Sequence, residues 1–206
     1  MDLSFDRPIP VFDPAKGLLH NDHFQLGYIT NDIERAADVF RQRFGVARFR
    51  ANDDTMTNGA TIRVRSVWIG RMMFELFSGA GPDMAFYTDS APPSGDFVLR
   101  FHHFGYLVPD DASWDALESQ LAEGDWPVRK RSDIPDYLRV CMVEAPELGH
   151  FLEFIQPRGG LIERFNATPV AYKSGPSPRP GSGYEGLARQ RLAAVGEGVL
   201  AVARHF

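Results

Sequence analysis

Two similar stretches of the sequence decide the fold, His23-Phe-Gln-Leu-Gly-Tyr-Ile29 and His103-Phe-Gly-Tyr-Leu-Val108. Each opens on a histidine and continues with apolar, β-favouring residues, which predicts a strand. Each is followed later by a glutamate inside another apolar stretch, Glu75 in the first half and Glu153 in the second. The spacings are alike, because 80 positions separate the two histidines and 78 separate the two glutamates. We infer that the chain contains an internal repeat.

The repeat covers a whole structural unit, because the surrounding residues give the same order of elements twice: strand, helix, three strands. Apolar residues at helical spacing predict the helices, and a glycine follows each of them. The predicted elements of the first half are strands at 23–29, 46–49, 60–69 and 72–77 and a helix at 33–44, with a polar turn at 52–54; those of the second half are strands at 101–108, 126–130, 138–144 and 150–155 and a helix at 112–123. One unit alone would leave a sheet face uncovered. We therefore predict an α+β fold of tandem βαβββ modules that form one curved mixed sheet.

Composition changes mark the limits of this repeat. Residues 1–20 contain three prolines and are expected to form an extended N-terminal arm. The domain is predicted to span 21–157, with module one at 21–80, a linker rich in Pro, Ser and Gly at 81–97, and module two at 98–157. Residues 158–206 form a C-terminal extension, in which a helix is expected over 184–195.

Composition also limits the class of function. The 206 residues carry a formal net charge of −5, which argues against a nucleic-acid partner. No apolar run approaches the ~20 residues of a membrane span, and the first residues lack the pattern of a signal peptide. The single cysteine, Cys141, cannot form an internal disulfide and fits a reducing compartment, so a cytoplasmic protein is expected.

Four residues at the repeated positions are candidate metal ligands. Because strand residues alternate between faces, His23, Glu75, His103 and Glu153 can all point into one cavity while their apolar neighbours face the helices. Imidazole nitrogen and carboxylate oxygen together suit one divalent ion such as Zn, Ni, Co, Mn or Fe. Any one of these residues alone would be an ordinary polar residue of a half-exposed strand. Four at matched positions favour the metal site.

The repeated unit, with a histidine opening its first strand and a glutamate in its last, resembles the vicinal oxygen chelate superfamily. That superfamily includes glyoxalase I, methylmalonyl-CoA epimerase, extradiol dioxygenases and bleomycin-type resistance proteins. The resemblance covers residues 22–157 and is carried by 23–36, by 101–110 and by 144–154, a turn and strand that end at the last ligand. The doubled His102-His103 is similar to the epimerase-type members, in which the second histidine is the ligand. His102 is then expected to point toward the helix layer.

The resemblance implies a metal held by His23, Glu75, His103 and Glu153. It implies an isomerase, epimerase or lyase that acts through an enolate-type intermediate on a small oxygenated substrate, in a chain that forms a homodimer. Glu153 is the expected base, and Glu75 is the alternative. Two other functions stay open. One is an Fe(II)-dependent ring-cleavage dioxygenase, and the other is a resistance-type protein that sequesters its ligand without turnover.

Six further residues are candidates for contacting the substrate. Arg63 and Arg65 alternate with apolar residues in a predicted strand, as does Arg139 in the second half, so each lies either in the cavity or on an exposed sheet face. Strand alternation also directs three aromatic side chains toward the metal position, namely Phe77, Phe101 and Phe151. These would favour a substrate with a hydrophobic or aromatic body.

Overall fold

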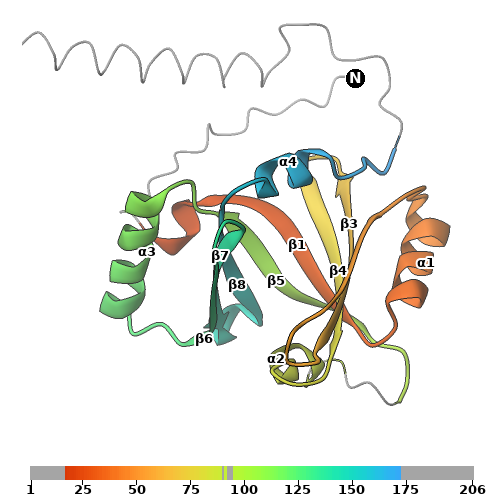
Figure 1. Ribbon diagram of the computed structural model, residues 1–206, viewed down its shortest axis with the longest axis horizontal. Helices are drawn as coiled ribbons and strands as arrows, with labels where there is room; N and C mark the ends of the chain where they lie inside the picture. Colours follow the sequence, from red (N-terminus) through yellow and green to blue (C-terminus); the bar gives the residue numbers. More distant parts are fainter. Residues whose placement is uncertain (1–16, 90, 92–94, 173–206) are drawn as a thin grey trace, which may run out of the picture. The chain divides into compact units, whose positions relative to one another are not determined.

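The computed structural model describes residues 17–89, 91 and 95–172, and their eight strands form one strongly curved mixed sheet (Figure 1). The strands are β1 (Asp22–Thr30), β2 (Arg50–Thr55), β3 (Thr61–Ile69), β4 (Met72–Ala80), β5 (Leu99–Leu107), β6 (Val128–Ile134), β7 (Leu138–Ala145) and β8 (His150–Pro157). The helices are η2 (Leu18–His20), α1 (Ile33–Phe44), α2 (Ala85–Thr88), α3 (Asp111–Glu123), η3 (Pro146–Leu148) and α4 (Leu161–Asn166).

The strand order β2-β3-β4-β1-β5-β8-β7-β6 confirms the tandem βαβββ architecture. Within each module the first strand pairs in parallel with the last, β1 with β4 and β5 with β8. The two modules then join through the antiparallel pair β1–β5. The first strands therefore lie at the centre of the sheet, and each module's outer strands curve away to form one wall.

The two long helices cover the convex side of the sheet, α1 over module one and α3 over module two (Figure 1). Each begins at an aspartate whose side chain accepts a backbone N–H, Asp32 from Arg35 and Asp110 from Ser113. Each then packs an apolar stripe on the strands beneath it. No helix in the described ranges is long and apolar enough to cross a membrane.

The second strand of module one differs from the prediction. The strand expected at 46–49 lies instead at Arg50–Thr55, so the predicted polar turn at 52–54 is part of β2. This strand pairs only with β3 and is almost wholly exposed. Its aspartate, Asp53, forms ion pairs with Arg63 and Arg65 of β3. Pairing and charge, rather than β-favouring composition, hold this segment in the sheet.

The C-terminal extension is partly an added piece of the core. After β8 the chain forms α4 and then pairs with β3 through a bridge between Val170 and Trp68. The Trp68 indole donates to the Phe165 carbonyl at 2.9 Å, and the Tyr172 hydroxyl donates to the Phe44 carbonyl at 2.6 Å. Residues 158–172 thus run from module two to module one. The helix expected over 184–195 lies outside the described residues.

Candidate metal and substrate cavity

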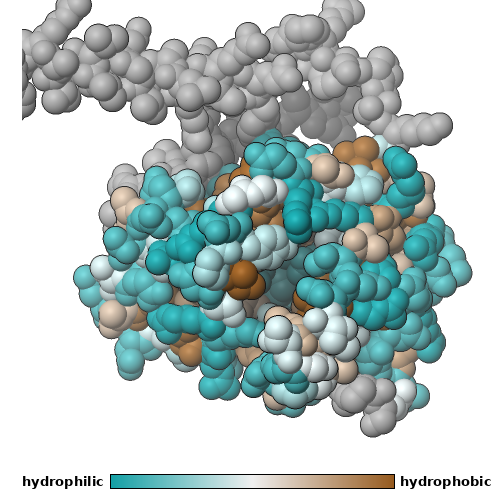
Figure 2. All heavy atoms as spheres, viewed as in Figure 1, coloured by the Kyte–Doolittle hydropathy of each residue, from teal (hydrophilic) through white to brown (hydrophobic). Residues whose placement is uncertain are grey.

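The concave side of the sheet encloses a cavity of about 230 Å³, and side chains of both modules line it. Figure 2 shows a hollow in the middle of this face, with a mostly hydrophilic rim. Apolar residues from the two outer walls, among them Val64 of β3 and Val140 of β7, face each other across it. Leu161 and Phe165 of α4 close one end. The cavity is therefore built from both modules and from α4.

Four polar side chains form the floor of this cavity: Gln25 on β1, Glu75 on β4, His103 on β5 and Glu153 on β8. Gln25 and His103 are each only 2% exposed. His103 Nε2 lies 3.1 Å from Glu153 Oε2 and 3.5 Å from Gln25 Nε2. The structure therefore brings together three of the predicted ligands, Glu75, His103 and Glu153, with a glutamine as the fourth member.

The strand register explains why glutamine takes the fourth place. One row across the sheet runs from Glu75 through Gly27 to His103, and the next runs from Gln25 through Gly105 to Glu153. The second row repeats the first, because 78 positions separate 25 from 103, 27 from 105 and 75 from 153. Gln25 is thus the counterpart of His103 in module one.

The predicted ligand His23 does not join this set. It is exposed and lies opposite Tyr106, with ring centroids 6.2 Å apart. The pairing of β1 with β5 shifts by one residue between His23 and Gln25, which is a β-bulge. The bulge breaks the simple alternation and aligns His23 with the face that Tyr106 packs under α3. The placement of His23 in the cavity is corrected accordingly.

Two glycines make room for the floor residues. A Cβ on Gly27 would lie 2.0 Å from the His103 ring, and a Cβ on Gly105 would lie 2.7 Å from the Gln25 Cβ. The His103 and Gln25 side chains therefore each lie over a glycine of the other module. This cross-arrangement is what allows a buried imidazole and a buried amide to lie side by side at the junction of β1 and β5.

The floor is electrostatically unbalanced without a cation. Burial, with repulsion from Glu153, raises the pKa of Glu75 to about 7, although His103 partly opposes the shift. Burial alone would lower the pKa of His103, but attraction to Glu153 and Glu75 raises it overall. Two carboxyl groups thus share one imidazole in a buried site.

The donor set fits a divalent cation in its chemistry. Glu153 Oε2 is buried, and apart from its 3.1 Å approach to His103 Nε2 it has no hydrogen-bond partner among the described residues, so this oxygen can still accept a ligand. Rotating the Gln25 amide would present its oxygen where its nitrogen now faces His103. In the described part of the chain, however, no three His, Cys, Asp or Glu side chains already stand close enough to hold a metal. A cation would require the Glu75 and Gln25 side chains to close around it.

His102 is a packed residue, as expected, but on the concave rather than the helix-covered side. The pairing of β1 with β5 shifts again at this point, because Gly27 lies opposite His103 and Tyr28 opposite Phe101. The His102 ring packs against Phe86 of α2, and its Nδ1 lies 3.0 Å from His103 Nδ1. Burial, with a contribution from His103, lowers the pKa of His102 to about 3, so its ring is neutral.

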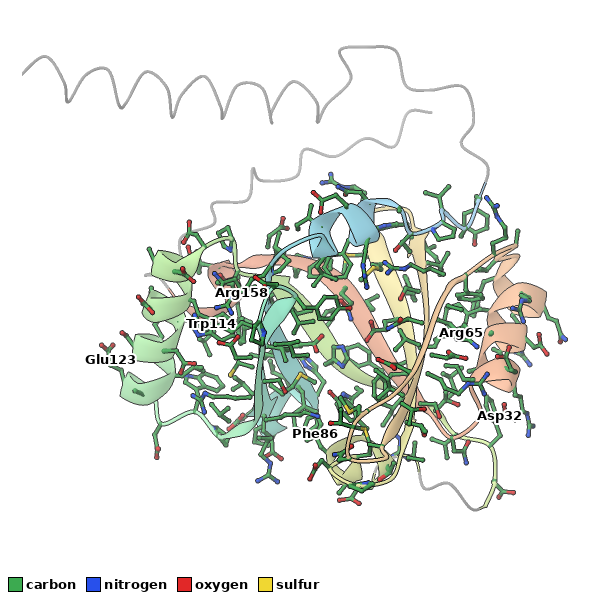
Figure 3. The ribbon with its side chains drawn as sticks, viewed as in Figure 1. Asp32, Arg65, Phe86, Trp114, Glu123 and Arg158 are labelled. Atoms are coloured by element: carbon green, nitrogen blue, oxygen red, sulfur yellow. The ribbon has the colours of Figure 1, made fainter. Side chains whose placement is uncertain are left out.

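The three predicted arginines lie on the helix-covered side, outside the cavity. Arg65 is buried between the sheet and α1 and pairs with Glu34 and Asp53 (Figure 3). Arg63 pairs with the same two carboxylates. Arg139 lies over the Trp114 ring of α3. The assignment of these arginines to the cavity is therefore corrected, because Val64 of β3 and Val140 of β7, not the arginines beside them, line the cavity.

The three predicted aromatic residues have separate places. Phe77 lines the cavity and packs on Tyr87, with ring centroids 4.3 Å apart. The Phe151 ring packs against the rings of His102 and Phe86. Phe101 packs on Tyr28, a residue that contacts the core under α1. The bulge at His102 turns Phe101 away from the cavity, which corrects its predicted role.

Sequence reasoning missed Gln25 as a ligand, although alternation puts it on the cavity side, and it missed other residues of the cavity altogether. Gln25 was identifiable, because an offset of 78 for the glutamates also relates Gly27 to Gly105 and Gln25 to His103. The roof residues of α4 and the polar Lys130 of β6 carry no comparable pattern in the sequence. Only the folded chain brings them to the cavity.

Several solved structures are similar to this chain. A methylmalonyl-CoA epimerase from Mycobacterium tuberculosis is 13% identical in sequence. The match covers 68% of this chain and 91% of the epimerase chain, with a TM-score of 0.47. A methylmalonyl-CoA epimerase in complex with methylmalonyl-CoA and ammonium is 12% identical and covers 66% and 94%, with a TM-score of 0.46. A hypothetical protein from Bacillus halodurans C-125 is 14% identical and covers 67% and 95%, with a TM-score of 0.46. No family model and no curated protein matches the sequence.

Proposed function

We propose that this protein is a metal-dependent isomerase of the vicinal oxygen chelate superfamily, which moves a proton on a small oxygenated substrate. One observation carries the proposal. Two partly buried carboxylates, a buried imidazole and a buried amide meet on the floor of a cavity, at positions that the two modules repeat. Gln25, Glu75, His103 and Glu153 would hold one divalent cation there.

The chemistry follows from the charges of these groups. A bound divalent cation would balance the two carboxylates and polarise a substrate oxygen. The proton would then be moved by one of the two glutamates. Without a cation the pKa of Glu75 is raised to about 7, but a cation bound to this carboxylate would lower it. Glu153 is therefore the base that the resemblance implies, with Glu75 as the alternative.

Metal binding tests the donor set directly. Protein purified without chelator should contain about one divalent ion per chain, or should take one up from Zn, Ni, Co, Mn or Fe. His103→Ala and Gln25→Ala should each weaken the affinity more than the ~10–100-fold loss typical of a supporting residue. His23→Ala is the matched control from the same strand and should leave affinity unchanged.

The outcomes separate the possible ligand sets. If His23→Ala lowers the metal affinity and Gln25→Ala does not, the ligand set proposed for β1 is wrong. A wild-type protein that binds none of the five metals would overturn the proposed function as a whole.

Proton transfer needs its own measurement. The metal-loaded protein is incubated in deuterated water with 2-oxo thiohemiacetals and acyl-CoA thioesters, and deuterium entering the carbon beside the carbonyl is followed by NMR. Exchange that Glu75→Gln abolishes supports the isomerase. Oxygen uptake with a catechol, without exchange in the other substrates, would contradict it and favour the dioxygenase.

A further inference from the structure

Each carboxylate of the floor shares its row with one cation from the edge strand of its own module. In module one the row continues from Glu75 through Ser66 of β3 to Arg50 of β2. In module two it continues from Glu153 through Met142 of β7 to Lys130 of β6. Both cationic side chains line the cavity. The repeat therefore places a positive charge on each wall, two strand spacings from a glutamate, or about 10 Å between Cα atoms.

The two cations have different surroundings. Arg50 Nη1 donates to the Arg164 carbonyl at 2.6 Å, so this guanidinium holds the last turn of α4 over the cavity. For Lys130, no carboxylate of the described residues lies within ion-pairing distance. Arg131, its neighbour on the helix-covered face, is paired with Glu118, and Arg129, at the register shift before Lys130, is paired with Glu144. Lys130 is thus the cation of β6 that points inward without a counter-ion.

The position of the Lys130 ammonium is well defined all the same. Its Nζ lies 4.8 Å from the centre of the Tyr87 ring, a cation–π contact that directs it toward the cavity floor. Burial lowers its pKa, while the charges of Asp83 and Glu153 oppose that shift. A half-buried ammonium held by an aromatic face, with no partner of opposite charge, is suited to bind an anion that enters from solvent.

We propose that Lys130 binds a carboxylate of the substrate, and that the substrate is a compact free acid with further oxygens for the floor of the cavity. The assignment rests on the proposed function, because the substrate's other end would meet the cation site of Gln25, Glu75, His103 and Glu153. Lys130 and that site lie on the same face of the sheet, at the two ends of one small molecule.

The size of the cavity supports a compact ligand. Its volume of about 230 Å³ is below the ~300–1,000 Å³ usual for pockets that enclose larger ligands. Leu161 and Phe165 limit it at the α4 end, and Arg50 fixes that roof. The walls between Lys130 and the roof are mainly aliphatic, so the body of the acid is expected to be apolar.

Malonate is a suitable probe, because one carboxylate can reach the metal while the other reaches Lys130. Calorimetric titration of malonate into the metal-loaded protein should show saturable binding. Lys130→Met should weaken it about tenfold to hundredfold, as expected for losing a hydrogen bond to a charged group. Lys130→Arg should retain part of the affinity. Arg131→Met, on the same strand but the helix-covered face, is the matched control and should bind malonate like the wild type.

The controls distinguish this assignment from the metal site. Malonamide has a similar size and oxygens but no charge, and its affinity should be insensitive to Lys130→Met. Equal malonate affinities of wild type and Lys130→Met, or no saturable malonate binding to metal-loaded wild type, would overturn the role of Lys130 and leave the metal site standing. Failure of the wild type to take up any metal would instead overturn the proposed function. Lys130→Gln provides a second variant if the methionine variant does not fold.

Discussion

The two modules place side chains at the same positions but differ in what they place there. At the ligand position of the first strand, module one has Gln25 and module two has His103. At the cationic position of the edge strand, module one has Arg50, which donates to the backbone of α4. Module two has Lys130, which contacts the Tyr87 ring and has no counter-ion among the described residues. Beneath the helices, Arg65 of β3 occupies the place that Cys141 occupies in β7. Register fixes where a residue lies, and its neighbours decide what it can do.

The largest expected effect comes from substituting Gly27 and Gly105, the glycines over which His103 and Gln25 lie. Gly27→Ala would push a methyl group into the His103 ring, whereas Gly105→Ala would meet only the Gln25 side chain at a longer distance. We expect Gly27→Ala to lower the free energy of unfolding by about 3 kcal/mol, and Gly105→Ala by less, about 1 kcal/mol. Urea unfolding of both variants measures this difference.

Gly160→Ala is the control for that comparison, because its Cβ would have nothing closer than 3.9 Å. It should change stability by less than about 0.5 kcal/mol. Equal costs for Gly27→Ala and Gly105→Ala would contradict the expected difference between the two sites, which rests on the closer approach of His103 to Gly27.

The two glutamates should differ in how they link stability to pH. In the metal-free protein the pKa of Glu75 is raised to about 7 from 4.5, mainly by burial and then by Glu153. A raised carboxyl pKa stabilises the fold below pH 4.5, and this stability is lost as the pH rises through about 7. The loss should be roughly 2–3 kcal/mol.

Chelator-treated protein tests this by urea unfolding at pH 4.5 and at pH 7.5. Glu75→Gln should remove most of the decrease, because an amide does not titrate. Glu153→Gln should reduce it only in part, by removing the repulsion and leaving the burial. A wild type that is equally stable at both pH values would contradict the shift.

A smaller difference is expected between the two arginine–glutamate pairs that connect sheet to helix. Arg65 pairs with Glu34 of α1 and is 8% exposed, whereas Arg131 pairs with Glu118 of α3 and is 52% exposed. Arg65→Met should cost about 1–2 kcal/mol, discounted for its half-exposed acidic partners, and Arg131→Met less than about 1 kcal/mol. Thermal unfolding at low and high salt compares them, and a greater loss in Arg131→Met would reverse our ranking.

The smallest expected effect concerns residues 158–172, the strap that runs from module two to module one. Trp68→Phe removes the indole hydrogen bond to the Phe165 carbonyl and should cost about 1 kcal/mol. Amide hydrogen exchange should accelerate in 158–172 and leave β5 and β8 unchanged. Uniform acceleration would mean that the strap is part of the global unfolding unit.

The sequence predicts the architecture well, because helix periodicity, strand alternation and an internal repeat are local patterns. The helix at 33–44 is found with those bounds. The site is predicted less completely. The two shifts in the β1–β5 pairing displace His23 and Phe101 from the cavity and turn His102 to the concave side, against Phe151, and no residue pattern marks a bulge of this kind.

The arginines show a second limit of reasoning from alternation. In β3 and β7 one face lies toward a helix and the other toward the cavity, so an apolar face can belong to either side. Arg63, Arg65 and Arg139 lie under the helices only because carboxylates of α1, β2, α3 and β6 meet them there. Such partners come from distant parts of the chain, and alternation within one strand does not reveal them.

Gly27 and Gly105 also restrict how the two halves of such a chain can diverge. A single substitution can exchange one donor for another, as the glutamine and histidine at the paired positions illustrate. A side chain at either glycine, however, would collide with the donor of the opposite half. Each module is thus free to exchange its own floor residue. The absence of a side chain at its glycine, however, is required by the floor residue of the other module.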